Sequence, residues 1–125
     1  MRLIDSSGWV EYFSKGPLAS AYRPYLNAPE DLITPAIVLY EVVKKVLIEE
    51  GEQSAAEAAA YIRKTQVIPL DDALAISAAK VSVKHKLPMA DAIIYATAQS
   101  LGATLITSDE HFQGLPGVEY IPRKE

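Results

Sequence analysis

The chain has 125 residues, 50% of them hydrophobic, so it is long enough to bury the core of one domain and too apolar to be disordered. We expect that domain to cover residues 1–125. The absence of cysteine excludes disulfides, thiolate metal ligands and cysteine nucleophiles, and fits a protein of the reducing cytoplasm. A formal net charge of −4 excludes nucleic-acid binding by overall charge, so an RNA or DNA partner would need a local basic rim or bound cations.

Five short apolar runs along the chain are typical of strands that are buried on both faces of a parallel sheet. The apolar runs are too short to cross a bilayer, so we expect no membrane-spanning helix, and the N-terminus lacks the apolar core of a signal peptide. In chain order, the predicted strands cover residues 3–5, 32–34, 67–70, 105–107 and 118–121.

Helical patterns occupy most of the sequence between these strands. Ser6 or Ser7 is the expected N-cap of the first helix, and Asp71 or Asp72 begins the fifth. Strands that alternate with helices indicate an α/β fold with a mainly parallel sheet. The predicted helices cover residues 6–14, 18–26, 34–50, 54–64, 71–85 and 88–101.

Four acidic residues are expected at one edge of this sheet. Asp5 directly follows the first strand, and Asp109 follows the fourth by two residues. Ligands of open α/β sheets bind at the carboxyl ends of the strands, and the neighbouring helices can bring Glu41 and Asp91 to the same edge. Converging carboxylates repel one another unless cations lie between them or their pKa values rise. Their hard oxygens suit Mg²⁺ or Mn²⁺, which points to metal-assisted hydrolysis of a phosphodiester.

Each acid also has a purely structural interpretation. Asp5 and Asp109 could be N-cap or turn residues, Asp91 could interact with a helix macrodipole, and Glu41 could pair with a lysine three or four residues further on. The helix that carries Glu41 is apolar on two sides, so we expect it to be largely buried, which favours a functional role for this glutamate. His111, two residues after Asp109, could approach the site, and the sequence leaves its participation open.

Segments from nearly the whole chain resemble PIN-domain ribonucleases, and most closely the VapC-type toxins of toxin–antitoxin pairs. The resemblance is carried by IDSS, TPAIVLYE, ADAIIYATA and LITSDEHF, which occur in the family's order and at ordinary spacing. It implies a three-layer α/β/α fold with a central, mainly parallel sheet of about five strands flanked by helices. It also implies an RNA substrate, one or two Mg²⁺ or Mn²⁺ ions, a VapB-like antitoxin as partner, and a homodimer.

The resemblance also assigns roles to individual residues. The family's catalytic and metal-binding acids match Asp5, Glu41, Asp91 and Asp109, with Glu41 as a ligand or as the group that orients the attacking water. Small hydroxyl residues that would donate hydrogen bonds to a carboxylate or phosphate match Ser6 and Thr107. Many relatives carry a further aspartate where this chain has His111. Six basic residues are candidates for guiding the RNA backbone: Lys15, Arg23, Lys44, Lys45, Lys84 and Lys86.

The expected function is therefore that of a metal-dependent endoribonuclease, the toxin of a VapBC-type pair. The alternatives are a housekeeping RNA-processing nuclease and a catalytically weak PIN-fold module used for binding or as a scaffold. Phosphatases of the haloacid dehalogenase type are disfavoured, because they need Asp-x-Asp where this chain has Asp5 and Ser7. A response-regulator receiver is disfavoured because no acidic pair follows the first strand.

Overall fold

The five predicted strands form one sheet in the computed structural model, which describes residues 1–123. Every pairing between these strands is parallel, and their order across the sheet is β3-β2-β1-β4-β5. The expectation of a mainly parallel sheet of about five strands is thus confirmed. The strands are β1 (Arg2–Ile4), β2 (Leu32–Pro35), β3 (Gln66–Ile68), β4 (Thr104–Thr107) and β5 (Val118–Tyr120).

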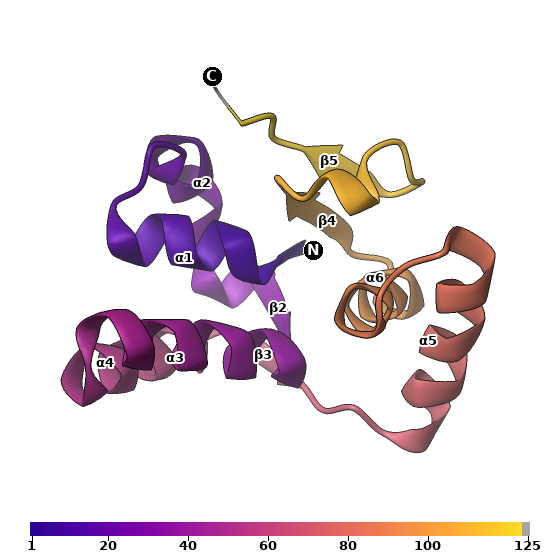
Figure 1. Cartoon of the computed structure of the whole chain (residues 1–125), viewed down its shortest axis with the longest axis horizontal. Coiled ribbons are helices and arrows are strands. Elements are labelled where there is room, and N and C mark those ends of the chain that lie inside the picture. The colour runs from indigo at the N-terminus through magenta and orange to yellow at the C-terminus, as the bar shows by residue number, and fades with distance from the viewer. Residues whose placement is uncertain (124–125) are drawn as a thin grey trace.

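Helices cover both faces of the sheet and complete the expected three layers. In Figure 1, α1 to α4 lie on the left and α5 and α6 on the right. Two short 3₁₀ turns, η1 (Pro29–Asp31) and η2 (Glu110–Phe112), complete the described elements. The helices are α1 (Ser6–Ser14), α2 (Ala19–Leu26), α3 (Ala36–Glu50), α4 (Glu52–Ile62), α5 (Asp72–His85) and α6 (Met89–Leu101). Within residues 1–123, no helix combines the length and the hydrophobicity that crossing a membrane requires.

The direction of the chain through the sheet reverses between β1 and β4. From β1 the chain proceeds outward to β2 and β3, and it then returns through α5 and α6 to β4 on the other side of β1. Right-handed crossovers in opposite directions place their helices on opposite faces, as Figure 1 shows. The carboxyl ends of β1 and β4 are therefore the topological switch point, where open α/β sheets bind ligands.

The core beneath this switch point is tightly packed. Leu3 and Ile4 of β1 and Leu105 and Ile106 of β4 are completely buried, as expected for strands covered on both faces. Gly8 in α1 provides space for the buried Tyr22 of α2, because a Cβ at this glycine would lie 2.5 Å from the Tyr22 ring. Packing of α2 against α1 thereby brings the tyrosine hydroxyl to the end of β4, where it meets Ser108.

Two local expectations are wrong. The N-cap of α1 is Asp5 instead of Ser6 or Ser7, because the helix begins directly after β1 and its first free N–H groups face the aspartate. Helix α3 is not largely buried: only Val38, Val42 and Val46 are fully covered, whereas Tyr40 and Ile48 are 60% and 76% exposed. The helix lies in an outer layer, so its apolar side chains on the side away from the sheet remain exposed. The fifth helix is capped by Asp71, as predicted, through a 2.8 Å bond from the Leu74 N–H.

Candidate active site

Asp5 is the most buried of the four predicted acids, with only 3% of its surface exposed. Its Oδ1 accepts hydrogen bonds from the Ser7 hydroxyl at 2.8 Å and from the Gly8 N–H at 3.3 Å. Its Oδ2 accepts a 2.6 Å bond from the Thr107 hydroxyl. Burial raises the pKa of Asp5 to about 6, and these three donors oppose that rise. The carboxylate is therefore held in one orientation, because it caps α1 and accepts a hydrogen bond from the end of β4 at the same time.

Thr107 connects the acids that follow the two central strands. This residue, the last of β4, is completely buried. Besides donating to Asp5, its hydroxyl oxygen accepts a 2.9 Å bond from the Asp109 N–H. The carboxylate of Asp109 in turn accepts from the His111 N–H at 2.9 Å and caps η2. One side chain thus fixes the positions of Asp5 and Asp109 relative to each other.

The open part of the site contains Asp91, Asp109 and His111. The His111 Nδ1 lies 2.8 Å from Asp91 Oδ2 and 3.3 Å from Asp109 Oδ1. One potential ligand atom from each of the three residues lies within 4.8 Å of the other two. Partial burial raises the pKa of Asp91, whereas the hydrogen bond with His111 lowers it. The same bond, together with the charge of Asp109, raises the pKa of His111.

Glu41 on α3 faces the same edge of the sheet. Its pKa is raised by partial burial and further by the negative charges of Asp91 and Asp109, while the nearby Ser6 hydroxyl opposes the rise. One carboxylate oxygen, Oε1, is buried and has no hydrogen-bond partner among the described residues. A buried unpaired carboxylate oxygen is costly, so this atom calls for a donor or a cation.

The alternative of a surface ion pair for Glu41 is wrong. Lys45 instead pairs with Glu49, at 2.9 Å, and the Lys44 ammonium lies over the Tyr40 ring, 5.7 Å from its centre. Glu41 is thus left without a lysine partner among residues 1–123.

A divalent cation fits this set of side chains. Asp91 and Asp109 offer carboxylate oxygens to the open side, and Glu41 offers one that has no partner. Hard oxygen donors are what Mg²⁺ and Mn²⁺ prefer, and the imidazole of His111 is a ligand that Mn²⁺ also accepts. Bound positive charge would also remove the mutual repulsion that raises the pKa of Glu41 and Asp91.

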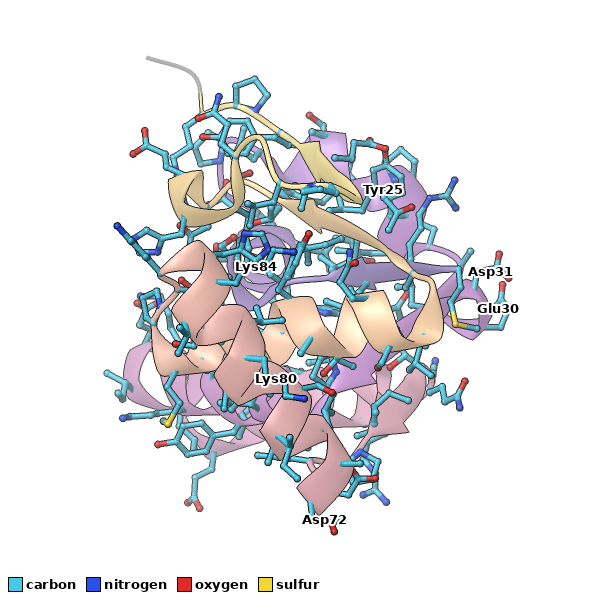
Figure 2. All side chains as sticks on the ribbon, turned by 90° about the vertical axis from the view of Figure 1, so that its right-hand side faces the viewer. Tyr25, Glu30, Asp31, Asp72, Lys80 and Lys84 are labelled. Carbon is cyan, nitrogen blue, oxygen red and sulfur yellow. The ribbon has the colours of Figure 1, made fainter. Side chains whose placement is uncertain are left out.

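The six basic residues predicted to guide RNA lie in different surroundings. Lys44 and Lys45 line hollows that also include Glu41. The other four, which are exposed near the ends of α1, α2 and α5, are Lys15, Arg23, Lys84 and Lys86. Figure 2 shows Lys84, with Lys80, on the outer side of α5. Of these six residues, only Lys44 and Lys45 therefore line a hollow together with one of the acids.

Three neighbours of the site could not be recognised in the sequence. Tyr22 and Ser108, both buried, share a 2.6 Å hydrogen bond, and burial raises the pKa of the tyrosine to about 12. Ser108 lies between Thr107 and Asp109, so this bond supports the segment that carries the site. Arg123 lines a hollow together with Glu41. Signals in the sequence are weak: Tyr22 belongs to an ordinary amphipathic helix, and Arg123 follows the last strand without any motif.

Comparison with known proteins adds independent findings. The sequence model of the family described as PIN domain matches residues 2–118. No curated protein sequence gives a significant match. A chain of a toxin–antitoxin complex from Klebsiella pneumoniae has 28% sequence identity and a TM-score of 0.80, with 95% of this chain and 96% of that chain covered.

Two further solved structures share the fold at lower identity. VapC20 of Mycobacterium tuberculosis, described as a sarcin–ricin loop cleaving toxin, has a TM-score of 0.71 and 22% identity, covering 83% of this chain and 85% of its own. A chain of DNA-bound VapBC from Salmonella typhimurium has a TM-score of 0.77 and 18% identity, covering 98% of both chains.

Proposed function

This chain belongs to the PIN-domain family, and we propose that it is a metal-dependent endoribonuclease that acts as the toxin of a toxin–antitoxin pair. One observation carries the proposal: Asp5 and Asp109, which follow β1 and β4, lie near Glu41 of α3 and Asp91 of α6 at the switch point of the sheet. The similarity to the Klebsiella pneumoniae toxin–antitoxin complex supports the toxin role, and the similarity to the sarcin–ricin loop cleaving toxin of Mycobacterium tuberculosis supports RNA as substrate.

In the proposed reaction, Asp91, Asp109 and Glu41 hold one or two Mg²⁺ or Mn²⁺ ions. Asp5 can contribute as well, because a carboxylate offers about four lone-pair sites and three of those on Asp5 accept hydrogen bonds. When bound, the cation supplies a water of lowered pKa and offsets negative charge on the scissile phosphate.

The chain's own side chains then position the reactants. Thr107 fixes the positions of Asp5 and Asp109 relative to each other through its two hydrogen bonds. Ser6 lies beside Glu41 and can donate a hydrogen bond to that carboxylate or to a phosphate oxygen. As an alternative to binding the cation, Glu41 can use its unpaired Oε1 to orient the attacking water.

Cleavage of a panel of RNAs tests the nuclease. We expect cleavage with Mg²⁺ or Mn²⁺, none in excess EDTA, and none by the Asp5→Asn variant with either cation. Equal cleavage in excess EDTA would show that the metal-dependent mechanism is wrong. A fully folded wild-type protein that binds these RNAs and leaves them intact with both cations would instead favour a binding or scaffold module.

We propose a VapB-like antitoxin and a second copy of the chain as partners. The exposed apolar side chains of α3, among them Tyr40 and Ile48, are available for such contacts. Expression of the protein alone should arrest growth, and co-expression of the adjoining small reading frame should relieve the arrest. Cleavage of RNA without growth arrest, and without such a reading frame, would identify a housekeeping nuclease.

A further inference from the structure

A cavity of about 400 Å³ adjoins the acids on the side of α1 and α3. It lies between the first turns of α1, the middle of α3 and the segment that follows β5. Glu41 forms part of its wall, so the cavity and the cluster of acids share one residue. Its volume falls within the range of pockets that bind small ligands. Its polar lining consists of Ser6, Ser7, Glu11, Glu41, Lys45 and Arg123.

Two cations in the lining come from distant parts of the chain. Lys45 belongs to α3, and Arg123 lies beyond the end of β5. Among residues 1–123, Arg123 takes part in no ion pair, and Lys45 is paired only with Glu49. The side chains of that pair are 54% and 46% exposed, so the pair contributes little stability and can exchange for another anion.

The carboxylate of Glu11 is already engaged inside the protein. Its Oε1 accepts a 2.7 Å hydrogen bond from the Leu18 N–H. The same carboxylate packs against Gly16, where a Cβ would lie 2.5 Å from it. Glu11 therefore connects the end of α1 to the start of α2 and leaves the two cations available to a ligand.

We propose that this cavity is the subsite for the RNA nucleotide next to the scissile bond, with Arg123 and Lys45 binding its phosphate. This inference rests on the proposed function. RNA with its scissile phosphate at the acids must place a neighbouring nucleotide beside them, and this cavity is adjacent through Glu41. The guanidinium of Arg123 can bind a phosphate through two parallel hydrogen bonds, while Lys45 supplies a point charge. The hydroxyls of Ser6 and Ser7 can donate further bonds.

The subsite also explains how an acidic protein could bind RNA. Four carboxylates repel a phosphodiester, and the overall charge of −4 offers no attraction. Lys45 and Arg123 place positive charge directly beside the acids, where the RNA backbone would be bound.

The test compares Arg123→Gln and Lys45→Gln with Lys80→Gln, a matched loss of charge on the outer side of α5, labelled in Figure 2. Affinity for a short fluorescein-labelled single-stranded RNA is measured by anisotropy in EDTA at several salt concentrations. Removal of one phosphate contact should lower the slope of log affinity against log salt by about 0.7. We expect this loss for each cavity variant and the wild-type slope for Lys80→Gln. With Mg²⁺ present, KM should rise roughly tenfold for Arg123→Gln, with kcat nearly unchanged.

Arg123→Lys provides a rescue measurement, because it retains the charge and loses only the paired hydrogen bonds. It should restore the salt slope and part of the affinity. The subsite proposal would be wrong if the salt slope were unchanged in both cavity variants, or if Lys80→Gln lowered it equally. The proposed nuclease function would not be affected by either result. Wild-type protein that binds RNA through these residues without cleaving it would overturn the proposed function alone. Wild-type protein that neither binds nor cleaves RNA would overturn both.

Discussion

The buried half of the site, at Asp5, and the open half, at Asp91 and Asp109, differ in burial and in the hydrogen bonds that their carboxylates accept. In the buried half, Asp5 accepts three hydrogen bonds and is almost fully covered. In the open half, Asp91 and Asp109 face each other with His111 as their shared neighbour, and the side chains are 16%, 33% and 59% exposed. We therefore expect different roles for the two halves: the buried acid fixes the geometry of the sheet edge, and the open acids offer carboxylate oxygens to a cation.

Loss of an acid should have the largest effect on activity, and an open acid should show it with the least change in stability. Asp109→Asn removes charge at the proposed metal position, and several kcal/mol of transition-state stabilisation correspond to a loss of activity of about a thousandfold or more. Stability of the metal-free protein should change little, because this side chain is partly exposed. RNA cleavage at saturating Mg²⁺ measures the effect. Asp72→Asn, at the far end of α5 in Figure 2, is the matched control and should retain full activity. Near-normal cleavage by Asp109→Asn would show that Asp109 does not take part in catalysis.

The buried acid should affect stability as well as activity. Its pKa is raised from 3.8 to about 6 in the folded protein, so the folded state binds the proton more tightly than the unfolded state does. The stabilising contribution is fully present below pH 3.8 and is lost as the pH rises through about 6. Two pKa units correspond to about 3 kcal/mol.

Asp5→Asn should remove this pH dependence in the metal-free protein. Urea unfolding in EDTA, at pH values on both sides of that range, gives the free energies of unfolding of variant and wild type. The wild type should lose about 3 kcal/mol more than the variant on going to neutral pH. Glu41 and Asp91 also have raised pKa values, but they are present in both proteins and cancel in the difference. Parallel pH profiles would show that Asp5 is already ionised at little cost in the folded protein.

Thr107 joins the two halves, so its loss should have an intermediate effect. Thr107→Val keeps the shape of the side chain but removes the donor to Asp5 and the acceptor for the Asp109 N–H. We expect a loss of about 1–3 kcal/mol in stability and of about 10- to 100-fold in metal affinity. Calorimetric titration with Mn²⁺ measures the affinity. Thr97→Val is the control, because its buried hydroxyl only donates to the Ile93 carbonyl within α6. Equal metal affinities in Thr107→Val and Thr97→Val would show that Thr107 does not support metal binding.

The fold and the shared edge of Asp5 and Asp109 could be predicted from local patterns alone. Short apolar runs define the strands, and a parallel sheet brings its carboxyl ends to one edge, which locates Asp5 and Asp109. Glu41 and Asp91 depend in addition on how α3 and α6 are rotated about their axes. Periodicity predicts a largely buried α3, and it does not show that Tyr40, Leu47 and Ile48 remain exposed.

What the sequence could not provide are contacts between distant residues. The bond between Tyr22 and Ser108 joins positions 86 residues apart, and no local signal distinguishes this tyrosine from the six others. Arg123 reaches the cavity only because β5 lies at the edge of the sheet and directs the following segment toward α1. The sequence presents a cap and a site residue as alternatives for Asp5, whereas its two oxygens allow it to cap α1 and to accept from Thr107 of β4 at the same time.

His111 should have the smallest effect, visible mainly as a pH dependence of metal binding. Its pKa is raised by the hydrogen bond with Asp91 and by the charge of Asp109. The ion pair of the His111 imidazolium with Asp91 and Asp109 contributes fully to stability below the ordinary histidine pKa of 6.5. That contribution is lost as the pH rises through the raised pKa of His111. Below that value the imidazolium competes with a cation for the two carboxylates. Mn²⁺ affinity of the wild type should therefore fall more steeply on acidification than that of His111→Gln, by a few-fold at most because the side chain is exposed. His85→Gln is the control, because that ring packs on Tyr95. Identical pH profiles for wild type and His111→Gln would show that the imidazole does not compete with the metal.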